Sequence, residues 1–295
     1  MATISRGTKA EKFQYINCYK DQFGVKRLCK HLSVSRSGYY DWLSREESTR
    51  SKSDHSLLAH IQRIFDENNG IYGSPRIHQA LRKIGISVGR KRVARLMKKA
   101  GLKARFATVF RYRSQSFENT YIADNLRLNG IKPISINQHW TSDLTYLRLG
   151  KNWVYLVVIL DLYSRRVVGW SIGNEKSSAL VIRALEFAMR KRKPDKGLLL
   201  HSDRGPEYVS DKLKKKIEGY GIIRSMSRAY RSIDNAEMES FFQKLKGEYL
   251  KGKAYHSIKQ LKKDVASYIN HFYNPKRLHS SLGYLSPMEF EARAA

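Results

Sequence analysis

The first third of the chain carries apolar residues at the spacing of amphipathic helices. In residues 25–44 these positions predict two short helices on either side of the turn Ser33-Val34-Ser35, an arrangement typical of a helix-turn-helix. We therefore expect a helix-turn-helix-like region over residues 1–45. The polar stretch 45–56 has no hydrophobic period, which favours a linker.

A second helical pair is predicted over residues 56–102. Ser74 and Ser87 are expected to cap its two helices, and Gly85 and Gly101 to end them. Apolar residues recur at the i, i+3, i+4 and i+7 spacing in both helices. These signals predict a second helix-turn-helix domain that binds DNA.

Beyond a connector predicted at residues 103–135, the hydrophobic pattern becomes strand-like. The expected strands are residues 139–149, 152–163, 165–173, the leucine run that ends before Asp203, and 222–226; the expected helices are 178–192, 207–219 and one that starts near Asp234. Three sequential strands and then alternating helices and strands predict a mixed five-stranded sheet covered by helices, in the ribonuclease H-like order. The expected fold class is thus an α/β core at residues 136–250, preceded by the all-α units and followed by a helical tail at residues 251–295.

The charge of the chain indicates a polyanionic partner. Lys and Arg total 56 against 26 Asp and Glu, a formal net charge of +30 that opposes compaction. The longest apolar run, residues 153–160, is too short to span a membrane, so nucleic acid is the expected partner. The amino terminus lacks a secretory signal, and Cys18 and Cys29 form neither a disulfide framework nor a zinc motif. We expect a reduced, cytoplasmic protein.

Positive charge is concentrated in the second helix-turn-helix and just beyond it. Residues 90–113 contain no Asp or Glu, which favours a recognition helix laid along DNA over a merely solvated basic face. The basic residues of this stretch are Arg90, Lys91, Arg92, Arg95, Lys98, Lys99, Lys103, Arg105, Arg111 and Arg113. Further DNA contacts are expected at Arg76, Lys244, Lys246, Arg277 and His279. The last two also fit a solvated basic loop.

Three acidic residues stand where buried or partly buried positions are predicted. Asp143 is centred in the first strand, Asp203 ends the leucine strand, and Glu239 lies on the flank of the apolar stripe of a helix. Each aspartate alone would also fit a structural role, neutralised by a helix cap or an ion pair. Glu237 has the simpler explanation of a capping pair with Asp234, whereas Glu239 has none.

Together, these three carboxylates fit the chemistry of phosphodiester cleavage and transfer. An in-line displacement has an attacking and a leaving oxygen that both carry charge, and two Mg²⁺ ions about 4 Å apart stabilise both. Such hard cations bind carboxylate oxygens. Acids gathered at one edge of the sheet would repel one another, and bound metal removes that cost. The pattern therefore predicts a magnesium-dependent site at Asp143, Asp203 and Glu239.

Other ionisable residues near this edge have competing explanations. Asp161 ends an apolar strand, and we expect a turn, Arg165 or Arg166 to hold it rather than a metal. His201 either orients the adjacent acid, contacts phosphate or is a hydrogen-bonded strand-end residue. Glu207 is a rival carboxylate, although the first turn of a helix is the expected place for it.

Four sequence motifs and one spacing match a known group of enzymes. The motifs are TSDLTY, HSDRG, DNAEMESFFQKLK and YNPKRLHSSLGYLSP, and thirty-five residues separate Asp203 from Glu239. Nearly the whole chain resembles the integrase-type Asp-Asp-Glu (DDE) transposases of bacterial insertion sequences. More narrowly, it resembles the downstream-frame protein of the group that transposes through an excised circle. In that group, a segment similar to YGSPRIHQAL and the basic helix forms the helix-turn-helix before the catalytic core.

The resemblance implies that Asp143, Asp203 and Glu239 are the catalytic and metal-binding triad, with Mg²⁺ as the cofactor and Mn²⁺ as its substitute. It also implies that water frees a 3′-hydroxyl at an element end and that this hydroxyl attacks another phosphodiester, without ATP or a covalent enzyme intermediate. The implied partners are the terminal inverted repeats, target DNA, further copies of the chain in a dimer or higher assembly, and an upstream-frame helix-turn-helix protein, all in the bacterial nucleoid.

The chain departs from the usual pattern of the group at three places. Gln is usual at the position of Glu207, Pro is usual at the position of Leu278, and residues 228–233 lack the usual Gly. These changes affect loops and leave the triad intact. Two other functions stay open: a structure-selective nuclease on the same fold, and a DNA-binding regulator with an inert core. The additional helix-turn-helix units argue against the nuclease, and the three retained acids argue against the regulator.

Overall fold

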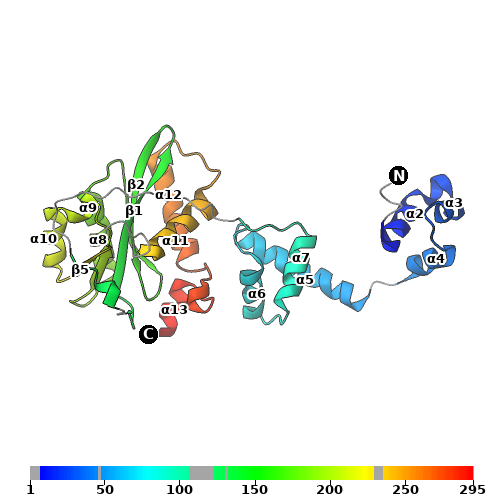
Figure 1. The fold of residues 1–295 in the computed structure, drawn as a ribbon, viewed down its shortest axis with the longest axis horizontal. Helices are drawn as coiled ribbons and strands as arrows, with labels where there is room; N and C mark the ends of the chain where they lie inside the picture. The colour runs from blue at the N-terminus through cyan, green and yellow to red at the C-terminus, as the bar shows by residue number, and fades with distance from the viewer. Residues whose placement is uncertain (1–6, 46–47, 106–122, 130–131, 229–234, 295) are drawn as a thin grey trace. The chain divides into compact units, whose positions relative to one another are not determined.

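The computed structural model describes residues 7–45, 48–105, 123–129, 132–228 and 235–294. The chain forms two compact units, Met1–Arg63 and Ile64–Ala295. The described part of the first unit is helical, and the second unit contains a sheet with helices on both faces (Figure 1). None of the described helices is long and apolar enough to cross a membrane.

Three helices form the core of the first unit. They are α2 (Lys9–Phe23), α3 (Val25–His31) and α4 (Arg36–Ser44). Each helix contributes buried side chains to a common cluster, among them Phe13, Leu28 and Tyr39. The two short helices predicted on either side of the serine turn are confirmed as α3 and α4, and both pack against α2.

The linker expected at residues 45–56 is wrong from Thr49 onward, because α5 (Thr49–Glu67) begins there. The first buried side chain of α5 is Leu57, two turns after its start. A polar sequence without a hydrophobic period therefore marks helical turns that stay largely exposed, and not a break in the helix. The boundary between the two units falls inside this helix.

The two helices of the second predicted pair are α6 (Ser74–Lys83) and α7 (Arg90–Lys99), which pack against each other. The predicted serine caps are wrong. The N-cap residues are Gly73 and Gly89, and neither helix has a side-chain cap hydrogen bond. The hydrophobic period locates the buried face of a helix, whereas its first residue depends on local backbone geometry that the period does not encode.

Five strands form one mixed sheet in the order β3-β2-β1-β4-β5. The strands are β1 (His139–Leu149), β2 (Asn152–Asp161), β3 (Val167–Gly173), β4 (Leu199–Ser202) and β5 (Ile223–Met226). The first three pair antiparallel, while β4 runs parallel to β1 and β5 runs parallel to β4. This arrangement confirms the predicted ribonuclease H-like sheet.

Helices cover both faces of the sheet (Figure 1). One face carries α8 (Ser178–Arg192), α9 (Pro206–Val209) and α10 (Asp211–Gly219); the other carries α11 (Ala236–Lys244) and α12 (Ile258–Ser267). At Gly169 the backbone of β3 lies so close to α8 that a Cβ atom would be 2.5 Å from the carbonyl oxygen of Ala184. Only glycine allows this approach.

The carboxyl-terminal segment is helical and is attached to the edge of the sheet. Its remaining elements are η3 (Leu245–Leu250), η4 (Tyr268–Tyr273), η5 (Ser280–Leu282) and α13 (Pro287–Ala294), and a short helix, η1 (Leu126–Asn129), precedes the sheet. The side chain of Asn274 accepts a hydrogen bond from the Val167 N–H and donates one to the Val167 carbonyl, both at 3.0 Å. Asn274 thereby satisfies the backbone of the edge strand β3.

Candidate active site

Two of the three predicted acids lie on neighbouring strands. In the parallel pair of β1 and β4, Thr141 is the partner of His201. Two residues further along each strand direction stand Asp143, within β1, and Asp203, directly after β4. Because side chains two residues apart share a face of a sheet, this register places the two carboxylates side by side, and both are half-buried.

The negative charges of these two acids repel each other. Burial and then the charge of Asp203 raise the pKa of Asp143 well above its usual value, although the Leu144 N–H donates a 2.7 Å hydrogen bond to its carboxylate. Burial also raises the pKa of Asp203, and the Gly205 N–H and the ammonium of Lys176 act in the opposite direction. The site therefore gathers more negative charge than the single ammonium of Lys176 neutralises.

The helix that carries Glu239 is anchored on β1. The hydroxyl of Thr141 donates a 2.5 Å hydrogen bond to Oδ1 of Asn235, at the start of α11, and the Asn235 amide donates one of 3.3 Å to the Ser142 carbonyl. These two hydrogen bonds hold the first turn of α11 against Thr141 and Ser142, the two residues that precede Asp143 in β1. Sequence reasoning missed Asn235, which looks like an ordinary helix cap but makes no side-chain cap hydrogen bond.

Glu239 itself is exposed on α11, and its charge contributes to the raised pKa of Asp143. Among the described residues, no three His, Cys, Asp or Glu side chains are arranged as a group that holds a metal ion. The structure thus brings Asp143 and Asp203 together, but Glu239 does not complete a three-residue metal-binding group with them. The donor chemistry still fits a hard divalent cation, because clustered, half-buried carboxylates are stabilised by such a charge.

A fourth acid, Glu207, lies in the first turn of α9. Its side chain is buried, and Oε2 lies 3.3 Å from Nζ of Lys176. Burial raises the pKa of Glu207 in spite of that ammonium, and the charge of Asp203 acts in the same direction as burial. At Gly205 a Cβ atom would lie 2.6 Å from Oε1 of Glu207, so this turn is built around the acid. The helix start was expected from the sequence; the burial and the contact with Lys176 were not.

The sequence matches two kinds of protein family. An HTH-like domain matches residues 52–108, and an integrase core domain matches residues 135–232, with a second integrase core domain match at residues 220–287. Over 282 residues the chain is 34% identical to the transposase InsF for insertion sequence IS3A of Escherichia coli (strain K12), which covers 95% of this chain and 98% of that protein. The chain belongs to the IS3 family of insertion-sequence transposases.

Two further proteins are similar to this transposase. It is 37% identical over 266 residues to an insertion element IS600 protein of 31 kDa from Shigella sonnei, with 90% of this chain and 98% of that one covered. Among solved structures, the HTLV-2 integrase catalytic core domain in complex with magnesium is 18% identical, with a TM-score of 0.42 over 54% of this chain and 99% of that chain. Family membership makes this chain a DDE-type polynucleotidyl transferase that acts in transposition.

Asp161 has a structural role in the transposase. It is buried, and its carboxylate accepts hydrogen bonds from the N–H groups of Asn137 (2.7 Å) and Ser164 (2.9 Å). The interpretation that a turn holds it is therefore confirmed. Arg165 and Arg166, which were alternative partners, form ion pairs with other carboxylates.

His201 is buried and hydrogen-bonded at the end of its strand. Its Nδ1 lies 2.9 Å from the hydroxyl of Ser225, and its Nε2 lies 3.0 Å from the hydroxyl of Ser227. Both serines belong to β5 or follow it directly. Of the alternatives drawn from the sequence, these contacts favour the hydrogen-bonded strand-end residue.

The expectation that Arg277 and His279 contact DNA is wrong. Arg277 is 1% exposed, and its guanidinium donates to both oxygens of Glu248, at 2.8 and 2.5 Å. His279 is 5% exposed, and its ring lies edge-on at 5.0 Å from the Tyr273 ring. Burial, together with the nearby cations, lowers the pKa of His279 to about 2. Neither side chain has the surface that a phosphate contact needs.

The remaining residues predicted to contact DNA differ in exposure. Arg76 is half-buried and donates a 2.9 Å hydrogen bond to the Leu278 carbonyl, and Lys246 donates one of 2.7 Å to the Thr145 hydroxyl. Lys244 and Arg92 are half-buried. Those exposed to solvent are Arg90, Lys91, Arg95, Lys98, Lys99, Lys103 and Arg105. Arg111 and Arg113 lie outside the described residues, as does Asp234, the predicted capping partner of Glu237.

Proposed function

We propose that this transposase cleaves DNA at the ends of its insertion sequence and joins the freed ends to target DNA, in a metal-dependent reaction at Asp143, Asp203 and Glu239. The observation that carries the proposal is the pair of half-buried aspartates in β1 and directly after β4, where burial and then the charge of Asp203 raise the pKa of Asp143. A structural role offers no reason to keep two half-buried carboxylates side by side.

The residues of the site divide the work between the sheet and α11. Asp143 and Asp203 would hold divalent cations from the sheet, and Glu239 would hold them from the helix. Two Mg²⁺ ions, or Mn²⁺ in their place, supply charge stabilisation to the attacking and leaving oxygens of an in-line displacement. Lys246, whose ammonium donates a hydrogen bond to Thr145 on the strand of Asp143, would bind a neighbouring phosphate of the DNA.

The reaction has two steps that need no energy source. Water attacks a phosphodiester at an element end, and the P–O bond to the 3′ oxygen breaks, which frees a 3′-hydroxyl. That hydroxyl then attacks a phosphodiester of the target, so that one P–O bond forms as another breaks. Since two ends must be joined, a dimer or higher assembly on DNA is part of the proposal. An upstream-frame helix-turn-helix protein is a further partner.

Replacement of Asp203 by Asn tests the chemistry. We expect Asp203→Asn to abolish cleavage of a labelled element end in Mg²⁺, because the amide removes a charge that binds the cation. Binding of the same DNA should stay nearly unchanged. Asp211→Asn is the matched control, since Asp211 is exposed and begins α10. Cleavage by Asp203→Asn at the wild-type rate would reject the proposed site. Cleavage without joining by the wild type would favour a nuclease, and binding without cleavage a regulator.

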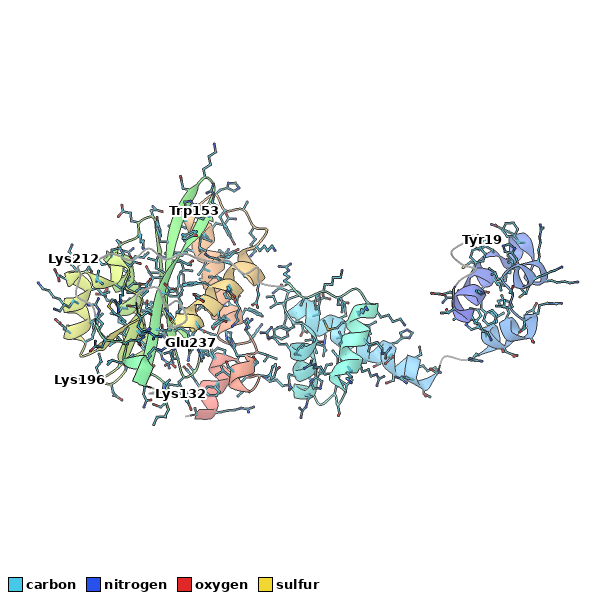
Figure 2. The ribbon with its side chains drawn as sticks, viewed as in Figure 1. Tyr19, Lys132, Trp153, Lys196, Lys212 and Glu237 are labelled. Atoms are coloured by element: carbon cyan, nitrogen blue, oxygen red, sulfur yellow. The ribbon has the colours of Figure 1, made fainter. Side chains whose placement is uncertain are left out.

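The basic helix α7 is the proposed contact with the terminal repeats. Replacement of Arg92 and Arg95 by Ala should weaken DNA binding and reduce the slope of log K against log salt by roughly 1 for each phosphate that is no longer bound. Fluorescence anisotropy of a labelled duplex over a salt series measures both. Lys212→Ala with Lys215→Ala is a control of equal charge, because both lysines are exposed on α10. Lys212 is labelled in Figure 2. An unchanged slope in the α7 variant would place that helix away from the DNA.

A further inference from the structure

A cavity of about 240 Å³ opens beside α11. Side chains from four segments line it, among them Arg165, Glu237, Ser240, Lys244, Tyr273 and Ser281. Ser240 and Lys244 lie on one face of α11, together with Glu237. Glu239 points away from that face, because it is one residue before Ser240 and about 100° further round the helix. The cavity is therefore separate from the acids of the active site.

Lys244 is an unusual residue for the wall of a cavity. It is half-buried, its ammonium donates a 2.7 Å hydrogen bond to the hydroxyl of Ser240, and within the described residues it forms no ion pair. Burial, and then the charge of Arg277, lower its pKa to about 8. A partly desolvated cation without a carboxylate partner is costly, and an anion in the cavity would offset that cost.

Arg165 adds a second cation to the same wall. Its guanidinium lies 3.2 Å from Glu237, but that carboxylate also binds Arg127, at 3.0 Å. Arg165 therefore shares its carboxylate partner with a second guanidinium. The backbone of Arg165 has φ of +60°, a left-handed conformation that is strained for a residue with a side chain.

Further positive charge acts on Lys244. The charges of Arg76, Arg277 and Arg165 all act on Lys244, whereas Glu248 is the carboxylate that acts on it in the opposite direction. Both carboxylate oxygens of Glu248 already accept hydrogen bonds from the guanidinium of Arg277, with which Glu248 forms a buried ion pair. The hydroxyls of the cavity wall supply hydrogen-bond donors beside this excess of cations. Ammonium, guanidinium and hydroxyl groups are together the donors that bind phosphate.

We propose that this cavity is a phosphate-binding site, with Lys244 and Arg165 as its cationic ligands, and that it takes a phosphate group of the DNA backbone. Inorganic phosphate shares the same chemistry and is the probe for the site itself. The DNA source rests on the proposed function. A phosphate held on this face of α11 would fix the helix from the side opposite Glu239, and so position that acid for the reaction.

Two measurements on the full chain test the proposal. Isothermal titration calorimetry follows binding of inorganic phosphate at constant ionic strength, without metal. Fluorescence anisotropy follows binding of a labelled duplex over a salt series. We expect Lys244→Gln to weaken phosphate binding by roughly tenfold or more, because a charge-assisted hydrogen bond is removed. The salt slope of DNA binding should fall by about 1. Lys259→Gln, the same change at an exposed position on α12, should alter neither quantity.

Each outcome decides one part of the proposal. Phosphate binding by Lys244→Gln with wild-type affinity would overturn the site. Loss of phosphate binding with an unchanged salt slope would overturn the DNA assignment. Lys244→Arg keeps the charge and should retain phosphate binding, which separates loss of the ligand from loss of the fold. Because phosphate binding needs neither metal nor cleavage, the result is independent of whether Asp203→Asn still cuts DNA.

Discussion

Buried carboxylates gather in two regions of the transposase, and their surroundings are opposite. At the end of the sheet, burial raises the pKa of Asp143, Asp203 and Glu207; the charges of Asp203 and Glu207 raise that of Asp143 further, and the charge of Asp203 raises that of Glu207. The half-exposed Lys176 is the cation that acts on Asp203 and Glu207. In the carboxyl-terminal segment each buried acid has its own arginine. Glu248 binds Arg277 through both oxygens.

Glu291 is the second compensated acid of that segment. Its carboxylate accepts hydrogen bonds from Arg166, Arg192 and the hydroxyl of Ser164. Burial alone would raise the pKa of Glu291, but these three donors lower it below its usual value. Residue type and burial therefore do not distinguish a structural acid from a reactive one. Charge compensation does, because an acid that already has a cation has no need of a metal.

The largest expected effect on the free energy of unfolding comes from removing a compensated acid of the carboxyl-terminal segment. Glu248→Gln should reduce the free energy of unfolding by about 3–5 kcal/mol, because it leaves the charge of Arg277 buried without a partner. Urea denaturation followed by circular dichroism measures the reduction. The control is Glu289→Gln, which removes an exposed ion pair with Lys83 (2.8 Å) and should cost no more than about 1 kcal/mol. Equal reductions in the two variants would contradict the claim that the buried ion pair of Glu248 matters more for stability than the exposed ion pair of Glu289.

A smaller effect should appear as a dependence on pH. The lowered pKa of Glu291 means that its contribution to stability is fully present above the usual carboxyl pKa of about 4.3 and is lost as pH falls through the lowered value. Glu291→Gln lacks this contribution at every pH. The difference in unfolding free energy between wild type and variant should therefore shrink as pH falls from about 5 toward 3. A difference that is constant over this range would contradict the compensation of Glu291.

The smallest effect on the free energy of unfolding is expected when the buried acid that is replaced by Gln is Glu207, at the end of the sheet. Glu207→Gln removes the ion pair with Lys176 but also removes one of three repelling charges, so the two changes oppose each other. Unfolding free energy, measured with a chelator present, should change by much less than in Glu248→Gln, because the lost attraction and the lost repulsion offset each other. A reduction as large as that of Glu248→Gln would show that Glu207 belongs with the structural acids.

Much of the backbone follows from local patterns in the sequence. The helix predicted at residues 178–192 is α8, and the strand predicted at 139–149 is β1, with the same bounds. The order of strands places Asp143 and Asp203 at one end of the sheet before any coordinates are known. Hydrophobic period and strand order are properties of nearby residues, so one sequence is enough to predict them.

Only the tertiary structure decided which charged residues are paired. Arg277 reads as a basic loop residue in the sequence, yet its partner Glu248 lies 29 residues earlier and buries it. Glu291 and Arg166 are 125 residues apart. Lys176 reaches Glu207 from the segment before α8. The sequence alone determined where the acids stand along the strands and helices, whereas their burial and their counter-charges depend on how distant segments pack, because electrostatic interactions act through space and not along the chain.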